Sequence, residues 1–396
     1  MSEWQLLKFK DLFSIPLRNG LTKPSRVRGS GLRMVNMKEI FGYNFIDDKT
    51  PMELVPISEN ERSSMLAFND LLFARQSLVE SGAGKIAIFK GNEPTVFESH
   101  LIRCRLDLEK GFADFIYYLF KSSTGRGAVS TIVQQVAAAG IRGSDLQELT
   151  FNIPPLPEQK AIAAVLSSLD DKIDLLHRQN KTLEAMAETL FRQWFIEEAK
   201  DDWEDGCLGD IVTNVKDTVS ASNINEDWIY IGLEHISRRN IALTQYGYGR
   251  DVSSNKFFFK QNDILFGKLR PYFHKVCFSA IEGICSTDIL VLRPKKSDFF
   301  AFSLFAFYQD DVVEFANLGS GGTRMPRTDW NMLKSFPIAL PDKNIIKRFN
   351  NLVIPSLEKI TKNIIQIQTL EKLRDNLLPK LMSGEVRVSY EQQDAA

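Results

Sequence analysis

The chain has 396 residues, of which 44% are apolar and 25% are charged, and its formal net charge is −1. These values are typical of a globular protein with two or three domains and exclude an overall basic character that would point to nucleic acid. No apolar run is long enough to span a membrane and no signal peptide is recognisable, so we expect a cytoplasmic protein without membrane contact. The four scattered cysteines form no Cys-x-x-Cys pair and have no histidines at ligand spacing, which predicts reduced thiols and no metal site.

The first predicted element is a globular domain over residues 1–156. Short apolar, β-branched and aromatic runs, cut by Gly, Pro, Asn and Asp, indicate strands in a mixed α/β domain. Two basic segments of this domain, residues 12–38 and 115–144, contain no acidic residue. Arg, Lys and Gln side chains can contact phosphates or base edges. A solvated loop is the alternative for each segment. The candidates for contact with a nucleic acid here are Arg26, Arg28, Arg75, Gln76 and Arg142.

A long helix is predicted over residues 157–198. Its apolar positions recur in alternating steps of four and three, which is the spacing of a coiled-coil seam. Pro157 suits the first turn, and Glu158 would lie at the positive end of the helix dipole. A stripe of this length needs a second helix to bury it. The predicted seam residues are Ile162, Leu166, Leu169, Ile173, Leu176, Asn180, Leu183, Ala187, Leu190 and Trp194.

Asn180 is the polar member of this seam, and two interpretations of it stay open. A buried asparagine would penalise wrong registers because its amide must find a partner. Alternatively, Asn180 lies at a frayed edge of the seam and is solvated.

Residues 199–341 repeat the first domain. Trp4 and Trp203 match at an offset of 199, and Leu156 and Leu340 match at an offset of 184, with the other matches in order between them. The second copy has therefore lost short loop segments, and a duplicated unit suggests a target with two similar parts. The candidates for contact with a nucleic acid in this copy are Lys268, Arg270, Tyr272, Arg324 and Arg327.

A second long helix with a tail is predicted over residues 342–396, and it is the expected partner of the first. Pro355 is expected to break the preceding stretch, residues 343–354, from the main helix. Packing of each helix on its own domain is the less favoured alternative. The predicted seam residues are Leu357, Ile360, Ile364, Ile367, Leu370, Leu373, Leu377 and Leu381.

Catalytic machinery is not recognisable in the sequence. There is no Gly-x-x-x-x-Gly-Lys-Ser/Thr phosphate loop, no Gly-x-Gly-x-x-Gly turn and no Asn-Pro-Pro-Tyr motif of amino-methyltransferases. We therefore expect a recognition component and not a catalyst. Two rivals remain: a coiled-coil scaffold or adaptor whose globular ends bind protein, and a self-sufficient methyltransferase or nuclease.

Several segments resemble type I restriction-modification specificity subunits. The segment IPPLPEQKAIAAVLSSLDDKID at 153–174 resembles their central conserved region, and LRDNLLPKLMSGEVRV at 373–388 resembles their distal one. FNDLLFARQS and QNDILFGKLRPYF resemble a strand and loop of their target recognition domains. The resemblance extends over nearly the whole chain.

The resemblance implies an α+β fold with two pseudo-symmetric target recognition domains, separated by two long helices that pair as an antiparallel coiled coil. Each domain would read half of a split, asymmetric site on double-stranded DNA, and the helices would set the spacer. Two modification subunits would bind S-adenosylmethionine and methylate adenine, and restriction subunits using ATP and Mg would join for cleavage. This chain itself would hold no cofactor.

Overall fold

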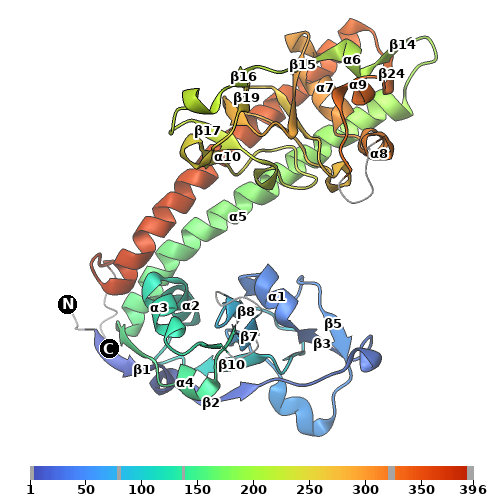
Figure 1. The fold of residues 1–396 in the computed structure, drawn as a ribbon. Coiled ribbons are helices and arrows are strands. Elements are labelled where there is room, and N and C mark those ends of the chain that lie inside the picture. The colour runs from blue at the N-terminus through green and yellow to red at the C-terminus, as the bar shows by residue number, and fades with distance from the viewer. Residues whose placement is uncertain (1–3, 78–81, 136–138, 320–325, 390–396) are drawn as a thin grey trace. The chain divides into compact units, whose positions relative to one another are not determined.

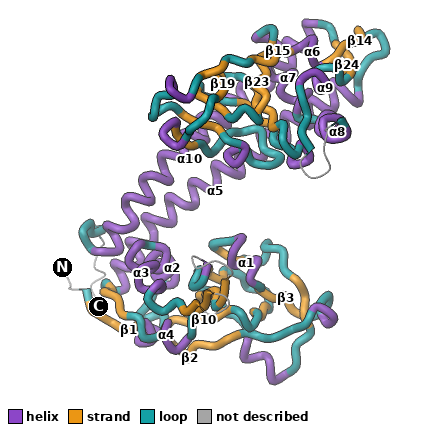
Figure 2. The backbone as a smooth tube through the Cα atoms, viewed as in Figure 1, coloured by secondary structure: helices purple, strands orange, loops and turns teal. Residues whose placement is uncertain are grey.

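The computed structural model describes residues 4–77, 82–135, 139–319 and 326–389 (Figures 1 and 2). The chain forms two compact units. The first unit comprises residues 1–172 and 370–396, and the second unit comprises residues 173–369. Each unit therefore contains one globular domain and a stretch of both long helices. None of the described helices is long and apolar enough to cross a membrane.

The globular part of the first unit is built on a five-stranded sheet of order β2-β10-β6-β8-β4. Its strands are β2 (Phe13–Asn19), β10 (Leu101–Leu106), β6 (Leu71–Ala74), β8 (Ile86–Phe89) and β4 (Phe45–Ile46). Smaller sheets are β5-β3-β9, β11-β12-β7 and β1-β13. Their strands are β1 (Gln5–Lys8), β3 (Leu32–Val35), β5 (Glu53–Val55), β7 (Gln76–Ser77), β9 (Thr95–Phe97), β11 (Gln134–Gln135), β12 (Ala139–Gly140) and β13 (Thr150–Ile153). The helices are α1 (Met37–Gly42), α2 (Ala113–Lys121), α3 (Ser123–Ser130) and α4 (Gly143–Leu146).

The second unit repeats this plan with a four-stranded sheet of order β15-β23-β20-β21. Its strands are β15 (Val212–Val215), β23 (Ile289–Pro294), β20 (Ile264–Gly267) and β21 (Val276–Phe278). A five-stranded sheet of order β16-β19-β22-β17-β18 and the pair β14-β24 complete it. Their strands are β14 (Glu204–Cys207), β16 (Thr218–Val219), β17 (Ile229–Ile231), β18 (Gly247–Tyr248), β19 (Lys256–Phe259), β22 (Gly283–Cys285) and β24 (Pro337–Leu340). The helices are α6 (Leu208–Ile211), α7 (Phe300–Phe307), α8 (Asp310–Leu318) and α9 (Trp330–Leu333).

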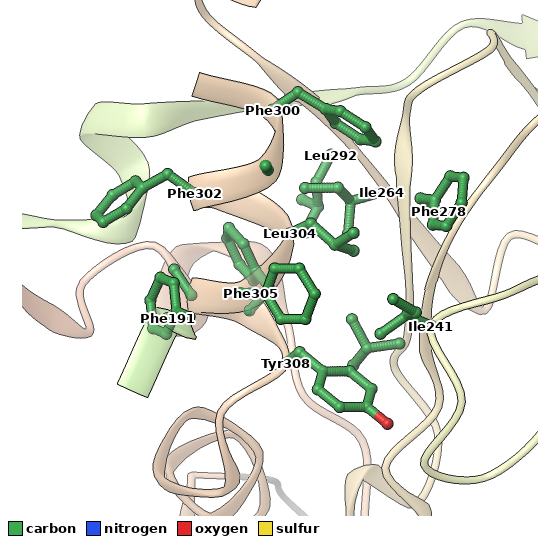
Figure 3. Close-up of a cluster of buried hydrophobic side chains, with 14 of the residues drawn as sticks. Phe191, Ile241, Ile264, Phe278, Leu292, Phe300, Phe302, Leu304, Phe305 and Tyr308 are labelled. Carbon is green, nitrogen blue, oxygen red and sulfur yellow. The ribbon is translucent and has the colours of Figure 1, made fainter. Parts of the chain in front are cut away.

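The core of the second unit explains why α7 is apolar on every side. All eight residues of FAFSLFAF are buried, as a helix enclosed by other elements requires. Figure 3 shows Phe302 and Phe305 of α7 with Phe191 of the long helix α5, and the Phe191 and Phe302 rings lie 5.7 Å apart. The globular domain is thereby fixed to the helix stretch of its own unit.

The two long helices are α5 (Leu156–Arg192), followed by one π-helical turn (Gln193–Glu197), and α10 (Lys343–Ser383). In the first unit the beginning of α5 lies beside the end of α10, where Arg374 donates to Asp170 at 2.8 Å. In the second unit the end of α5 lies beside the beginning of α10, where the Phe191 and Phe349 rings are 5.9 Å apart. The helices therefore pair antiparallel within each unit.

Most predicted seam residues are buried, some of them in the core that the helices form with the globular domain of their own unit, and the polar member has a partner. Asn180 is 8% exposed, and its Oδ1 accepts a 2.7 Å hydrogen bond from Asn363, which is fully buried. The buried interpretation of Asn180 is therefore the correct one, and the solvated one is wrong. The buried apolar members are Ile162, Leu166, Ile173, Leu176, Ala187, Leu357, Ile360, Ile364, Ile367 and Leu381, and the half-buried ones are Leu169, Leu183, Leu190, Trp194, Leu370 and Leu377.

Two predictions about the second helix are wrong. Leu373 is 45% exposed, because two successive steps of three residues turn it roughly 120° away from Ile367 on an α-helix. Arg374 takes the inward position instead and pairs with Asp170. Pro355 does not break the helix, since α10 runs unbroken through it. The proline is exposed and buried Val353 and Leu357 flank it, so packing of its neighbours holds the helix together.

Candidate nucleic-acid interface

The first candidate loop follows strand β6 and is held by backbone hydrogen bonds. The Arg75 N–H donates to the His100 carbonyl at 2.8 Å, and the Ile141 N–H donates to the Arg75 carbonyl at 2.9 Å. Gln76 then pairs with Gly140 between β7 and β12. Arg142 follows Ile141 directly. The candidates Arg75 and Gln76 therefore lie close to the backbone of Arg142, although Gln76 and Arg142 are 66 residues apart in the chain. Gln76 and Arg142 are exposed, and Arg75 is half-buried.

The second unit builds the equivalent loop with equivalent bonds. The Lys268 N–H donates to the Asp288 carbonyl at 2.8 Å, and the Thr328 N–H donates to the Lys268 carbonyl at 3.1 Å. Leu269 forms an antiparallel bridge with Arg327, in the place where Gln76 pairs with Gly140. Lys268 is therefore the structural counterpart of Arg75.

Arg270 and Tyr272 extend this second loop. Arg270 has left-handed backbone angles (φ 51°), and its N–H donates to the Pro326 carbonyl at 2.7 Å. The Arg270 Nε is buried without a hydrogen-bond partner among the described residues. Tyr272 is 51% exposed, and its ring packs edge-on against Phe273 at 4.7 Å. The loop thus presents a cation and an aromatic ring close to Lys268.

The electrostatic surroundings of Lys268 favour an anion. Burial is the main cause that lowers the pKa of Lys268, and the positive charges of Arg327 and Lys216 lower it further, while Asp288 raises it. Asp288 also forms an ion pair with Arg327. One carboxylate therefore serves two cations, and an incoming phosphate would relieve their mutual repulsion.

The remaining candidates for DNA contact are Arg26, Arg28 and Arg324, and the first two differ in exposure. Arg26 is exposed in a 3-10 turn, whereas the Arg28 guanidinium is engaged within the fold. The Arg28 guanidinium donates to the Lys23 carbonyl at 2.9 Å and forms an ion pair with Glu53. Its N–H groups therefore already have partners within the fold. Arg324 lies outside the described residues.

Sequence reasoning missed the ion pairs that brace both loops. Asp70, fully buried, accepts two 2.7 Å hydrogen bonds from Arg105, and Asp263 accepts bonds of 2.7 and 2.6 Å from Arg293. In each copy the preceding asparagine, Asn69 or Asn262, has a positive φ. The available signal was the Asn-Asp pair repeated at an offset of 193 and the arginine repeated at an offset of 188.

Comparison with known proteins decides the family. A family model described as the type I restriction modification DNA specificity domain matches residues 1–185 and 200–371. The chain belongs to this DNA specificity domain family. The two matched segments correspond to the two copies found in the sequence.

Relatives of the DNA specificity domain family resemble the chain over much of its length. The type I restriction enzyme MjaIX specificity subunit of Methanocaldococcus jannaschii is 25% identical to the chain. The alignment covers 98% of this chain and 94% of that subunit. The HindI specificity subunit of Haemophilus influenzae is 22% identical over 61% of this chain and 70% of its own. The crystal structure of a type I restriction-modification S subunit from M. genitalium has 16% identity and a TM-score of 0.61, covering 96% of each chain. This structural match confirms the predicted fold class.

Proposed function

We propose that the chain is the DNA-specificity subunit of a type I restriction-modification complex. Its two units would each read one half of a bipartite, asymmetric DNA site, and the paired helices would set the spacer. The observation that carries the proposal is one loop geometry built twice, with the same two backbone hydrogen bonds at Arg75 and Lys268. The scaffold is constant while the side chains differ, as reading two different sequences requires.

The catalytic steps would belong to partner subunits. Members of this family recognise DNA and are not catalysts. Two modification subunits holding S-adenosylmethionine would methylate adenine, and restriction subunits using ATP and Mg would cleave. We expect this chain to supply no cofactor-binding group to either reaction.

Methylome sequencing of a host with and without the chain tests the proposal. A two-part adenine-methylated motif should be present with the chain and vanish without it. An unchanged methylome would contradict the proposal and leave a protein-binding adaptor with two globular ends as the better interpretation.

Salt dependence separates these two functions in vitro. The assembled methyltransferase should lose DNA affinity steeply between about 50 and 200 mM salt, because bound phosphates release counterions. An adaptor that binds only protein would show no such DNA binding at either concentration.

A further inference from the structure

Among the described residues, the buried Arg103 of the first unit forms no ion pair of its own. Arg103 in β10 is 4% exposed, and its Nε has no hydrogen-bond partner among the described residues. Burial is the main cause that lowers the pKa of Arg103, and Asp70 opposes this while Arg105 and Arg18 add to it. The guanidinium nevertheless stays protonated, because arginine is not deprotonated in proteins. A buried cation without a partner is costly for the fold.

The neighbours of Arg103 add positive charge instead of removing it. Arg18 on β2 lies directly opposite Arg103 in the antiparallel register, and like charges at such positions repel. The nearby carboxylate, Asp70, is already committed to a bidentate pair with Arg105. The described side chains around Arg103 therefore leave an excess of cations.

These side chains line an open hollow of about 550 Å³. Arg18, Arg62, Arg103 and Arg105 contribute to its wall together with apolar groups of β2 and residues 63–67. Arg62 pairs with Glu59, but both side chains are largely exposed, and such surface pairs hold little energy. The hollow is large enough for an anion, and four arginines belong to its wall.

The second unit shows that the fold does not need this cation. The residue that lies opposite Leu72 in the first unit is Arg103, and the residue opposite Leu265 in the second is Val291. Val291 is fully buried, and its other neighbour is Val215 in the place of Arg18. The bracing pair of Asp263 with Arg293 is kept. The fold therefore does not require an arginine at position 103.

We propose that the hollow around Arg103 binds a phosphate group, and that this is a backbone phosphate of the DNA half-site held by the first unit. The source of the phosphate rests on the proposed function, whereas the phosphate chemistry does not. Arginine forks match phosphate oxygens in charge and geometry.

The hollow and the candidate loop belong to the same unit. Arg103 lies three residues along the chain from His100, whose carbonyl accepts a hydrogen bond from the Arg75 N–H. Successive side chains of a strand point to opposite faces, so the DNA assignment rests on the proposed function and on the cations of the hollow.

Inorganic phosphate added to the full chain tests the site independently of DNA. The midpoint of thermal unfolding should rise with phosphate relative to chloride at matched ionic strength, because a ligand that binds the folded state stabilises it. Arg103→Val, which introduces the residue found at 291, should fold and lose this rise. Lys49→Ala removes an exposed lysine outside the hollow and should keep it.

DNA binding by the assembled methyltransferase tests the source. Arg103→Val should weaken binding about ten-fold or more, equally for cognate and unrelated DNA, and should reduce the slope of log K against log salt by about 0.9. Lys49→Ala should change neither quantity.

The outcomes separate the two parts of the proposal. A phosphate effect together with an unchanged salt slope would overturn the DNA assignment and indicate a free phosphate as the ligand. Weaker binding of the modification subunit with an unchanged salt slope would overturn it in favour of an acidic protein segment. The site itself would be overturned if phosphate did not raise the unfolding midpoint of the wild type. It would also be overturned if the folded Arg103→Val variant kept the same rise. Absence of any DNA binding by the wild-type complex would contradict the proposed function and leave the phosphate measurement to decide the site.

Discussion

At the scale of single residues, the two copies place different cations on one scaffold. Arg75 and Lys268 make equivalent backbone hydrogen bonds, each with residues of its own unit, yet a guanidinium and an ammonium contact DNA differently. Arginine can bind a phosphate or guanine in a bidentate manner, whereas lysine acts as a compact point charge. The equivalence of these two positions accounts for how one fold could read two unlike half-sites.

Replacing these cations should weaken DNA binding. We expect Arg75→Ala and Lys268→Ala each to weaken DNA binding by the assembled methyltransferase by about 1–3 kcal/mol. Fluorescence anisotropy measures this on a DNA duplex that contains the motif identified by methylome sequencing. Lys49→Ala is the control for loss of one positive charge. Wild-type binding and methylation in both variants would remove Arg75 and Lys268 from the DNA interface.

The sequence could predict this equivalence but not the role of every cation. The repeated Asn-Asp turn carries Arg75 and Lys268 to matching places, and that spacing is local. Arg28 is engaged by Glu53, 25 residues away, and Arg103 lies opposite Arg18, 85 residues away. Such pairings depend on sheet register, which residue types within a loop do not reveal.

At the scale of elements, the long helices show where periodicity is reliable and where it is not. The alternating steps of four and three predicted the buried side of α5 correctly. Pro355 was misjudged because local propensity opposes a helix there, whereas burial of Val353 and Leu357 favours it. Tertiary packing of a flanking pair outweighs the loss of one backbone hydrogen bond.

The buried amide pair between the helices should be costly to break on one side. In Asn363→Leu, Asn180 and Gln179 lose the donor that now lies at 2.7 and 2.9 Å, and an unsatisfied buried polar group costs about 1–3 kcal/mol. Chemical denaturation should show this loss. The double variant Asn180→Leu with Asn363→Leu should recover most of it. Equal destabilisation by the single and double variants would argue against a coupled pair.

Glu184 on α5 makes a second testable contact in the second unit. Its carboxylate accepts hydrogen bonds from the Ile241 N–H at 2.7 Å and the Tyr308 hydroxyl at 3.0 Å, and burial is the main cause that raises its pKa. A raised pKa means that the folded state prefers the protonated acid. Stability should therefore increase as pH falls through the folded pKa towards the unfolded value of 4.5.

Glu184→Gln should reproduce the protonated state at all pH values. We expect it to stabilise the protein near neutral pH by about 1.4 kcal/mol for each unit by which the pKa is raised. Denaturation midpoints measured between pH 8 and 4 should show the advantage shrinking as pH falls. An advantage independent of pH would mean that packing, and not the charge, is responsible.

At the scale of the whole molecule, duplication divides recognition into two separately built parts. Each unit has its own core, its own bracing pair (Asp70 with Arg105, Asp263 with Arg293) and its own loop. A change in one loop therefore acts first on the core and the bracing pair of its own unit. Residues outside the bracing pair can diverge while the scaffold is kept. Position 103 in β10 holds an arginine, and its counterpart 291 in β23 holds a valine.

This separation predicts that a substitution in one loop changes one half of the recognised motif. Arg270→Ala should relax base preference only in the half read by the second unit, because its backbone is anchored to Pro326 of the same unit. Gln76→Ala, exposed in the first unit, should relax only the other half. Methylome sequencing of hosts carrying each variant measures this directly, since each motif position is scored on its own. If either variant altered both halves together, the units would not read independently, and a single continuous DNA-binding surface would have to replace the two-reader proposal.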